Sequence, residues 1–295
     1  MTLEKKSSCK VNLLLNILGK RADGFHELES VMHPVNVCDR LNFSRGGSGI
    51  QLTCSDPALP TGDQNLVCRA AAALLQAINT KEGVCIHLEK RIPLAAGLGG
   101  GSGNAATTLL GLNELFGRPL ASEPLYQLAA SLGSDVPFFL QDKPALATGR
   151  GEKIQPLGFF RALRGAAILL AYPGFGISTA WAYQQLARFP AALKGRPGRA
   201  QALISLLQSS SLKTVGAEFY NSLEAPALEK HPLLALYQEF LRANGAAVAL
   251  MSGSGSTVFG LFSNRKATKL AADRFRSSPD WRVWIVKTLQ RLPPR

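Results

Sequence analysis

The sequence predicts an α+β fold with mixed sheets, and three observations support this prediction. The chain has 295 residues, of which 46% are apolar and 18% are charged, so it can build a sizeable core. Segments with strand character come first along the chain. Helices and strands then follow without strict β-α-β alternation, which is typical of an α+β protein. The length suits one large domain or two of ordinary size.

In the first half, short apolar runs bounded by turn residues predict strands, at residues 11–18, 28–37, 50–54 and 84–88. Apolar residues at helical spacing predict helices, at residues 66–78, 105–116 and 122–132. We expect Ser122 to cap the last of these helices, because its hydroxyl can accept a hydrogen bond from a free backbone N–H. A turn-rich stretch at 148–151 then separates the two halves.

In the second half, apolar runs predict four further strands, at residues 166–172, 246–251, 257–262 and 283–286. Helical spacing predicts helices around residues 179–187, 199–207, 232–244 and 267–276. The segment 189–200 contains two prolines and three basic residues, and we expect it to be a surface loop.

The charge is unevenly distributed. The formal net charge of +13 favours a nucleic-acid or membrane-surface partner at first sight. However, residues 1–150 carry 14 basic and 13 acidic side chains, whereas residues 151–295 carry 19 and 7. The basic excess therefore says little about chemistry in the first half, and we expect neither a nucleic-acid nor a membrane partner.

The cysteines and the ends of the chain indicate a reducing compartment. The five cysteines are odd in number and show no C-x-x-C spacing, which argues against a disulfide framework and a cysteine-based zinc site. No apolar run approaches the ~18 residues of a membrane-spanning helix. The first residues are not followed by the apolar region of a signal peptide. These features predict a cytoplasmic protein.

The strongest motif is a glycine-rich segment that runs directly into a predicted helix. Glycine lets the backbone approach a ligand closely, and a helix start offers free N–H groups to a phosphate. A merely flexible turn is the alternative, but so many glycines are costly unless their geometry is needed. The segment lacks the lysine of a P-loop and is not the dinucleotide-binding pattern. It predicts a phosphate-binding loop made of Pro93, Leu94, Ala95, Ala96, Gly97, Leu98, Gly99, Gly100, Gly101, Ser102, Gly103 and Asn104.

Two polar residues of this segment have more than one interpretation. Ser102 can offer its hydroxyl to a phosphate or to Mg²⁺, and it can also cap the following helix. Asn104 is either an ordinary residue of the helix start or an amide that faces a ligand base.

The glycine-rich segment resembles the phosphate-binding loop of the GHMP kinases, a family that includes galactokinase, homoserine kinase and mevalonate kinase. Leu250-Met-Ser-Gly-Ser-Gly-Ser256 is similar to the third, C-terminal glycine motif of the family, and Gly133-Ser-Asp-Val-Pro-Phe-Phe139 resembles a segment of one branch of it. The resemblance implies a two-domain GHMP kinase fold, with a ribosomal-S5-domain-2-like domain at residues 1–155 and an α/β sandwich domain at 156–295. It also implies that ATP and Mg²⁺ are bound.

The segment Arg21-Ala-Asp-Gly-Phe-His-Glu-Leu28 resembles a motif found in one branch of this family only. The resemblance implies a small-molecule substrate, the cytidine diphosphate derivative of methylerythritol. Its 2-hydroxyl would be phosphorylated in a step of the non-mevalonate isoprenoid pathway. We expect a monomer or a weak homodimer.

The resemblance assigns the reacting groups. Asp135 would be the general base that takes the proton of the substrate hydroxyl, although in isolation it could merely cap a turn. Lys10 would lie beside it and stabilise charge near the transferred group, although a solvated strand-end lysine is the simpler interpretation. Asn12 is two residues further on and shares the face of the strand with Lys10.

The same resemblance assigns residues to the two ligands. Phe25 would stack on cytosine and His26 would hydrogen-bond its edge, although either could be structural. Thr179 and Tyr183 would contact the substrate as well, with Tyr183 as the second aromatic face, although a helical tyrosine is more often part of the core. Asn65 and Lys90 match positions that contact the base and ribose region of ATP, and Lys90 could equally be solvated.

Several residues depart from the family pattern. Phe25 replaces a tyrosine, Gly103 replaces a second serine, Ser134 replaces an alanine, and Ser8-Cys9 replaces a Pro-Ala pair. None of these changes removes a group that the chemistry requires, so we expect an active enzyme.

Two alternatives remain open. A sister kinase acting on homoserine or a mevalonate derivative has no use for Phe25, His26 and Tyr183 together, because its substrate carries no base. A nucleic-acid-binding protein would show steeply salt-dependent binding to DNA or RNA.

Overall fold

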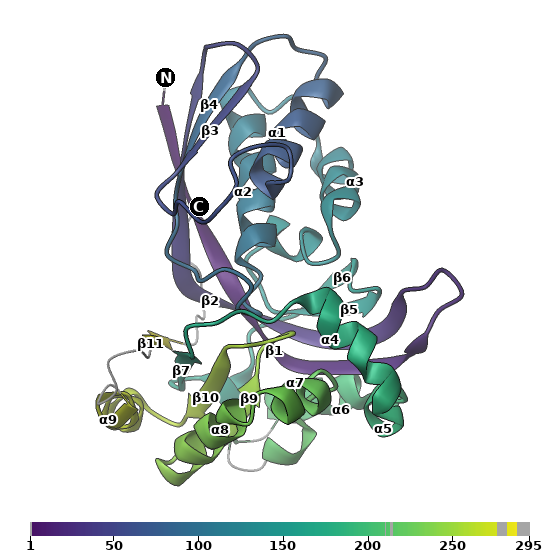
Figure 1. The fold of residues 1–295 in the computed structure, drawn as a ribbon, viewed down its shortest axis with the longest axis vertical. Helices are drawn as coiled ribbons and strands as arrows, with labels where there is room; N and C mark the ends of the chain where they lie inside the picture. The colour runs from purple at the N-terminus through teal and green to yellow at the C-terminus, as the bar shows by residue number, and fades with distance from the viewer. Residues whose placement is uncertain (1, 210, 213–214, 276–281, 288–295) are drawn as a thin grey trace.

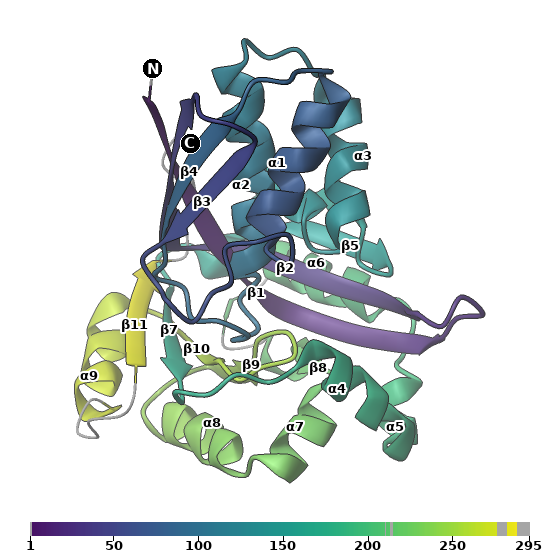
Figure 2. The ribbon, with the colours of Figure 1, turned by 45° about the horizontal axis from the view of Figure 1, so that its top comes forward.

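The computed structural model describes residues 2–209, 211–212, 215–275 and 282–287. Within these residues the chain forms two β-sheets with helices packed on them (Figures 1 and 2). The larger sheet and three helices form the upper part in Figure 1, and the smaller sheet lies below. This arrangement confirms the predicted α+β class.

The larger sheet is organised around a long antiparallel hairpin of β1 and β2, which pair from Thr2 with Ser44 to Lys20 with His26. The strand order is β3-β4-β2-β1-β8, with β5 paired to β2 and β6 to β5. Its strands are β1 Thr2–Lys20, β2 His26–Arg45, β3 Ile50–Cys54, β4 Val84–Glu89, β5 Ala145–Gly149, β6 Lys153–Pro156 and β8 Tyr220–Asn221.

The hairpin is much longer than the strands predicted at residues 11–18 and 28–37. Residues 2–6 alternate between exposed and half-buried, so they form a strand with one solvated face that an apolar run cannot reveal. The turn-rich stretch at 148–151 is also not a simple separator, because it connects β5 and β6 in an antiparallel pair.

Three helices cover one face of the larger sheet: α1 Leu66–Ala77, α2 Gly100–Leu115 and α3 Ser122–Leu132. Helix α2 begins five residues before its predicted start, because the glycines themselves form its first turn. The prediction that Ser122 caps α3 is wrong. Ala121 occupies the N-cap position, Ser122 is the first helical residue, and no side chain bonds the helix start.

The smaller sheet has the order β11-β7-β10-β9, and all of its neighbouring strands are antiparallel. Its strands are β7 Ala167–Tyr172, β9 Val248–Met251, β10 Val258–Phe262 and β11 Arg282–Lys287. The helices of this part are α4 Thr179–Gln185, α5 Pro190–Leu193, α6 Arg199–Ser209, α7 Glu224–Lys230, α8 Leu233–Ala243 and α9 Arg265–Phe275.

Three short elements of the second half of the chain were not predicted, namely α5 and α7 of this part and β8 of the larger sheet. Helix α5 lies inside the segment 189–200 that we expected to be a loop, since Pro190 begins a single helical turn. The end of the predicted helix 267–276 lies outside the described residues at position 276, and the rest forms α9.

The two sheets share one core. A cluster of buried residues joins Val11 and Leu13 of β1 to Leu170 of β7 and Phe259 of β10. The two halves of the chain are therefore packed directly together below the glycine-rich segment. All five cysteines are free. Among the described residues, no helix combines the length and apolar character that crossing a bilayer requires.

Candidate active site

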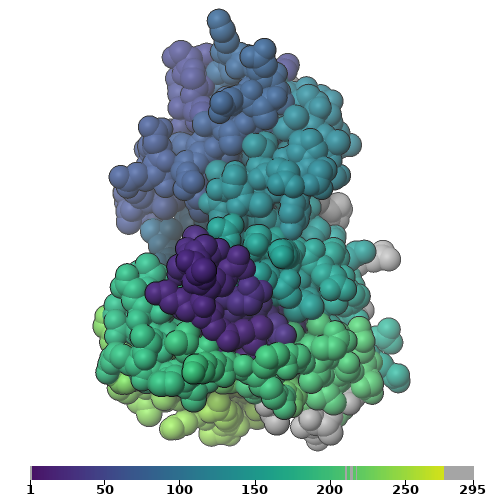
Figure 3. Space-filling view, turned by 90° about the vertical axis from the view of Figure 1, so that its right-hand side faces the viewer, coloured from purple at the N-terminus to yellow at the C-terminus, as the bar shows by residue number. Residues whose placement is uncertain are grey.

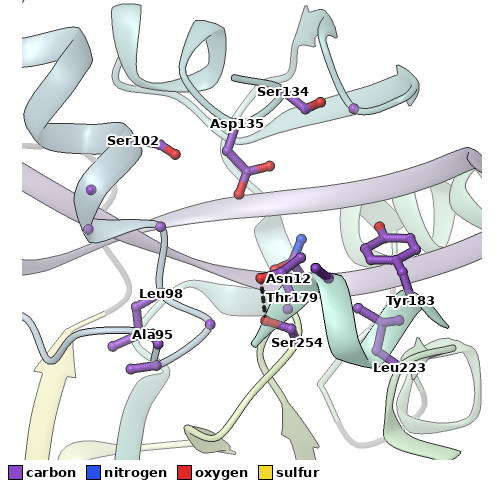
Figure 4. Close-up of a pocket in the computed structure, with 18 of the residues that line it drawn as sticks. Asn12, Ala95, Leu98, Ser102, Ser134, Asp135, Thr179, Tyr183, Leu223 and Ser254 are labelled. Atoms are coloured by element: carbon purple, nitrogen blue, oxygen red, sulfur yellow. Dashed lines mark hydrogen bonds between the residues drawn. The ribbon is translucent and has the colours of Figure 1, made fainter. Parts of the chain in front are cut away.

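A cavity of about 1150 Å³ lies where the start of α2, strand β1 and the segment after β9 meet (Figure 4). The structure brings almost all of the predicted site residues to its wall. The exception is Gly103, which lies one turn into α2 and does not line the cavity.

The glycine-rich loop has a backbone that other residues could not adopt. Gly97 has a φ of +74°, and a Cβ atom there would lie only 1.9 Å from the carbonyl oxygen of Ser252. Gly99 has a φ of +70° and forms the N-cap of α2, where no side chain bonds the free N–H groups. These N–H groups suit an anionic ligand at the helix start.

Ser102 does not cap α2, because it is the third residue of the helix. Its hydroxyl points toward the space in front of Asp135 (Figure 4). Gly103 is required for close packing, since a Cβ atom there would lie 2.6 Å from the carbonyl oxygen of Ser8 on β1. The glycine that departs from the family pattern at this position therefore lets α2 pack closely against β1.

Lys10 and Asp135 form an ion pair at the centre of the cavity. The Nζ atom of Lys10 lies 3.7 Å from Oδ2 of Asp135, and it also donates to Asn12 Oδ1 and to the carbonyl oxygen of Gly97. Burial lowers the pKa of the Lys10 ammonium, and the Asp135 carboxylate opposes that shift. The simpler interpretation of Lys10 as a solvated lysine is wrong, because the side chain is buried.

The 252–256 segment, which follows β9, is bonded to the charged centre of the cavity. Ser252 Oγ donates to the carbonyl oxygen of Gly97 at 3.0 Å and accepts from the backbone N–H of Asn12 at 3.3 Å. Asn221 donates to the carbonyl oxygens of Met251 and Gly253 at 2.8 Å each. Thus β1, the glycine-rich loop and the 252–256 segment are directly bonded to one another.

Sequence reasoning did not assign roles to Ser252 and Asn221. For Ser252, the run Ser252-Gly-Ser-Gly-Ser256 was a sequence feature from which a role could have been predicted. Asn221 had no such signal, because its partners lie about 30 residues further along the chain.

A buried ion pair lies under the first turn of α2. Lys90 Nζ and Asp39 Oδ2 are 2.5 Å apart, and their side chains are 4% and 0% exposed. The other Asp39 oxygen accepts from the backbone N–H groups of Arg91 and Ile92 at 2.7 and 2.8 Å. The alternative that Lys90 is solvated is therefore wrong.

Asp39 was missed by the sequence analysis, since it lies beyond the strand predicted at 28–37. Asn104 completes this network by donating to Asp39 Oδ2 at 2.9 Å and to Ser7 Oγ at 3.0 Å. Its amide nitrogen thus points into the protein. Asn65 also has local partners, because it caps α1 through Val67 N–H and donates to the carbonyl oxygen of Pro60.

The other end of the cavity is aromatic. The ring centroids of His26 and Tyr183 lie 5.1 Å apart, and Phe25 is 51% exposed at the tip of the hairpin. Burial lowers the pKa of His26, with a contribution from Lys20, and burial raises the pKa of the Tyr183 phenol. Figure 3 shows the hairpin tip, in purple, between the upper and lower parts of the molecule.

Thr179 lies at the start of α4, between this end and the centre of the cavity. Its hydroxyl is 2.9 Å from that of Ser254 in the 252–256 segment (Figure 4). The cavity therefore has a glycine-rich end, a charged centre and an aromatic end.

The donor set fits a nucleotide-bound Mg²⁺ better than a metal held by protein alone. Within the described residues, no group of three or more His, Cys, Asp or Glu side chains could hold a metal ion. Asp135 and Ser102 nevertheless supply one carboxylate and one hydroxyl to the same space. Mg²⁺ is commonly bound by one or two carboxylates together with substrate phosphates.

Comparison with known proteins gives the family. The model of the GHMP kinases N terminal domain matches residues 65–143, and that of the GHMP kinases C terminal domain matches residues 190–279. A 4-diphosphocytidyl-2-C-methyl-D-erythritol kinase of Geobacter sp. (strain M21) is 41% identical over 97% of this chain and 99% of its own. One of Synechococcus sp. (strain JA-3-3Ab) is 40% identical over 94% and 91%.

Solved structures agree. A crystal structure of 4-(cytidine 5'-diphospho)-2C-methyl-D-erythritol kinase superposes with a TM-score of 0.78 at 35% identity and covers 96% of this chain and 98% of its own. A mevalonate kinase has a TM-score of 0.75 at 15% identity, over 97% and 98% of the two chains, and shares the fold. The chain therefore belongs to the GHMP kinase family, within it to the 4-diphosphocytidyl-2-C-methyl-D-erythritol kinases, and is a small-molecule kinase that uses ATP.

Proposed function

We propose that the chain transfers the γ-phosphoryl group of ATP to the 2-hydroxyl of 4-diphosphocytidyl-2-C-methyl-D-erythritol, giving the 2-phosphate and ADP. This reaction is a step of the non-mevalonate isoprenoid precursor pathway. The observation that carries the proposal is the position of the Lys10–Asp135 pair, between a glycine-rich helix start and an aromatic end of one cavity. The names of the 40–41% identical relatives support it as well.

In the proposed reaction, Asp135 accepts the proton of the substrate hydroxyl. That oxygen forms a bond to the γ-phosphorus while the bond between this phosphorus and the β,γ-bridging oxygen breaks, and ADP leaves. Lys10 stabilises the negative charge that develops on the transferred group, and its bonds to Asn12 and Gly97 fix its direction. Phosphoryl transfer needs mainly positioning and charge neutralisation, which these groups provide.

The start of α2 is the proposed site of the ATP phosphates, and Asn65 and Lys90 are the proposed contacts toward its base and ribose. Since the amide of Asn65 and the ammonium of Lys90 already have protein partners, we expect both to act mainly by shaping the wall. Ser102 would hold Mg²⁺ together with the phosphates. When bound, this ion supplies positive charge that offsets the charge of the transferred group.

The aromatic end is the proposed cytosine site. Phe25 and Tyr183 offer ring faces, and the lowered pKa of His26 favours a neutral ring that can accept or donate a hydrogen bond at the base edge. Asn12 and Thr179 line the path between this end and Asp135. We also propose a division near residue 155, in β6, because all strands of the smaller sheet follow it, although β8 returns to pair with β1 of the larger sheet.

A coupled assay of ADP release tests the function. The purified chain is given ATP, Mg²⁺ and one acceptor: the cytidine diphosphate substrate, homoserine or mevalonate phosphate. We expect turnover with the first and none above background with the other two. Turnover with homoserine or mevalonate phosphate alone would show that the aromatic end has another role.

A further inference from the structure

The cavity contains more positive charge than the proposed mechanism uses. Its wall includes four cationic side chains, those of Lys10, Lys20, Lys90 and Arg150. Lys10 and Lys90 are buried and already hold carboxylate partners, Asp135 and Asp39, which the proposed site uses, whereas the carboxylate paired with Arg150, that of Glu152, lies 3.9 Å from its Nε. Lys20 is exposed beside His26, at the far end of the hairpin strands. Arg150 remains without a role.

Arg150 lines the cavity at its aromatic end, and the residue that follows it contacts the neighbour of the proposed general base. Its guanidinium carbon is 4.7 Å from the centroid of the Phe25 ring. The next residue, Gly151, packs against the neighbour of Asp135, because a Cβ atom at Gly151 would lie 3.6 Å from Cβ of Ser134. The Arg150–Gly151 segment therefore connects the base-stacking ring to the turn that carries the general base.

The backbone of Arg150 is fixed, while its guanidinium is available. The Arg150 N–H donates to Glu152 Oε2 at 2.7 Å, and Nε lies 3.9 Å from the same oxygen. The side chain is 33% exposed. Among the residues that the structure describes, the guanidinium donates no hydrogen bond to the protein, so its Nη groups can bind a ligand in the cavity.

We propose that Arg150 binds the diphosphate of the cytidine substrate and thereby selects a nucleoside diphosphate over a bare nucleoside. The inference rests on the proposed function. A base at Phe25 and a hydroxyl at Asp135 require the diphosphate between them to follow the path on which Arg150 lies. The planar fork of an arginine matches two phosphate oxygens at once, and its charge favours the anion.

Calorimetric titrations with cytidine and with CDP test this assignment, with a non-hydrolysable ATP analogue kept saturating so that only the second site is measured. For Arg150→Met we expect CDP to bind about 10- to 100-fold more weakly, with cytidine unchanged within about 2-fold. Arg150→Lys keeps the charge and loses the fork, so we expect an intermediate loss. Phe25→Ala removes the stacking face and should weaken both ligands by the same factor.

Lys153→Met is the matched control, because it removes one positive charge from an exposed position on β6 outside the cavity. We expect it to leave both affinities unchanged. Equal weakening of cytidine and CDP in Arg150→Met would overturn the proposal and show that the arginine only orients Phe25. Wild-type protein that binds CDP no more tightly than cytidine would overturn it too.

The ADP-release assay separates this result from the proposed function. Turnover of the cytidine diphosphate substrate by the wild-type chain, combined with no loss of CDP affinity in Arg150→Met, refutes the diphosphate contact and leaves the kinase activity standing. Absence of wild-type turnover refutes the function itself.

Discussion

The Lys10 ammonium lies 3.7 Å from the Asp135 carboxylate, with the lysine side chain 4% exposed and the aspartate side chain 36% exposed. The cation is thus enclosed in the protein, while the carboxylate remains open to a ligand in the cavity. This asymmetry suits a fixed electrostatic partner beside a group that must reach a substrate proton.

Asp135→Asn should abolish most of the catalysis, because an amide cannot accept the hydroxyl proton. We expect kcat to fall by about 10²- to 10⁴-fold with little change in the KM for ATP. Steady-state kinetics and circular dichroism of the same preparation check this. A variant that keeps near-full kcat and a native spectrum would show that Asp135 is not the base.

The affinity for the cytidine substrate should depend on pH through His26. Burial lowers the pKa of this residue below its ordinary value of 6.5, so the neutral ring is present at neutral pH and above. We expect KM to be flat there and to rise only as pH falls through the lowered pKa, where the ring becomes charged. His26→Gln should flatten the profile. A rise in KM that begins above pH 6.5 and persists in His26→Gln would contradict this role.

Gly97→Ala should damage the phosphate-binding loop. The new methyl group would overlap the carbonyl oxygen of Ser252, and the φ of +74° is unfavourable for alanine. We expect a loss of at least about 1–2 kcal/mol in the free energy of unfolding and a raised KM for ATP. Gly158→Ala is the control, since a Cβ atom there meets nothing within 4 Å. Urea unfolding of the two variants should differ clearly, and equal stabilities would refute the packing argument.

Asp39→Ala should destabilise the protein strongly, because it leaves the buried Lys90 ammonium without its partner. Breaking one side of a buried ion pair costs about 3–5 kcal/mol. For comparison, Glu229→Ala removes the partner of the exposed Arg188, which is worth about 0–1 kcal/mol. Thermal unfolding of both variants checks the contrast, and a loss below 1 kcal/mol at Asp39 would argue against a buried pair.

The elements that sequence reasoning predicted well have clear local signals. Strand β3 and helix α3 begin and end at the predicted residues, because turn residues or an apolar stripe mark them on both sides. Helix α2 begins before its predicted start. A run of glycines has poor helix propensity, and only tertiary packing makes it helical. Strands β5 and β6 were not predicted, because the glycines where they meet resembled a plain turn.

The site shows the same division. Lys10, Ser102 and Asp135 could be named from motif and chemistry, and the structure places them around one cavity. The partners that hold the site could not be named in this way. Asp39 lies about 50 residues from Lys90 along the chain, and Ser252 lies 155 residues from Gly97. Such contacts depend on the sheet register and the packing of the two halves.

The bond between Ser252 and Gly97 has a consequence for how ligands enter. A rotation that parted the two sheets at this seam would break the bonds of Ser252 to Gly97 and Asn12, and it would bring water to the enclosed Lys10 ammonium. Both costs oppose a hinge at the catalytic centre. ATP and its co-substrate therefore enter a cavity whose catalytic centre is already assembled, and no hinge motion is needed at this seam.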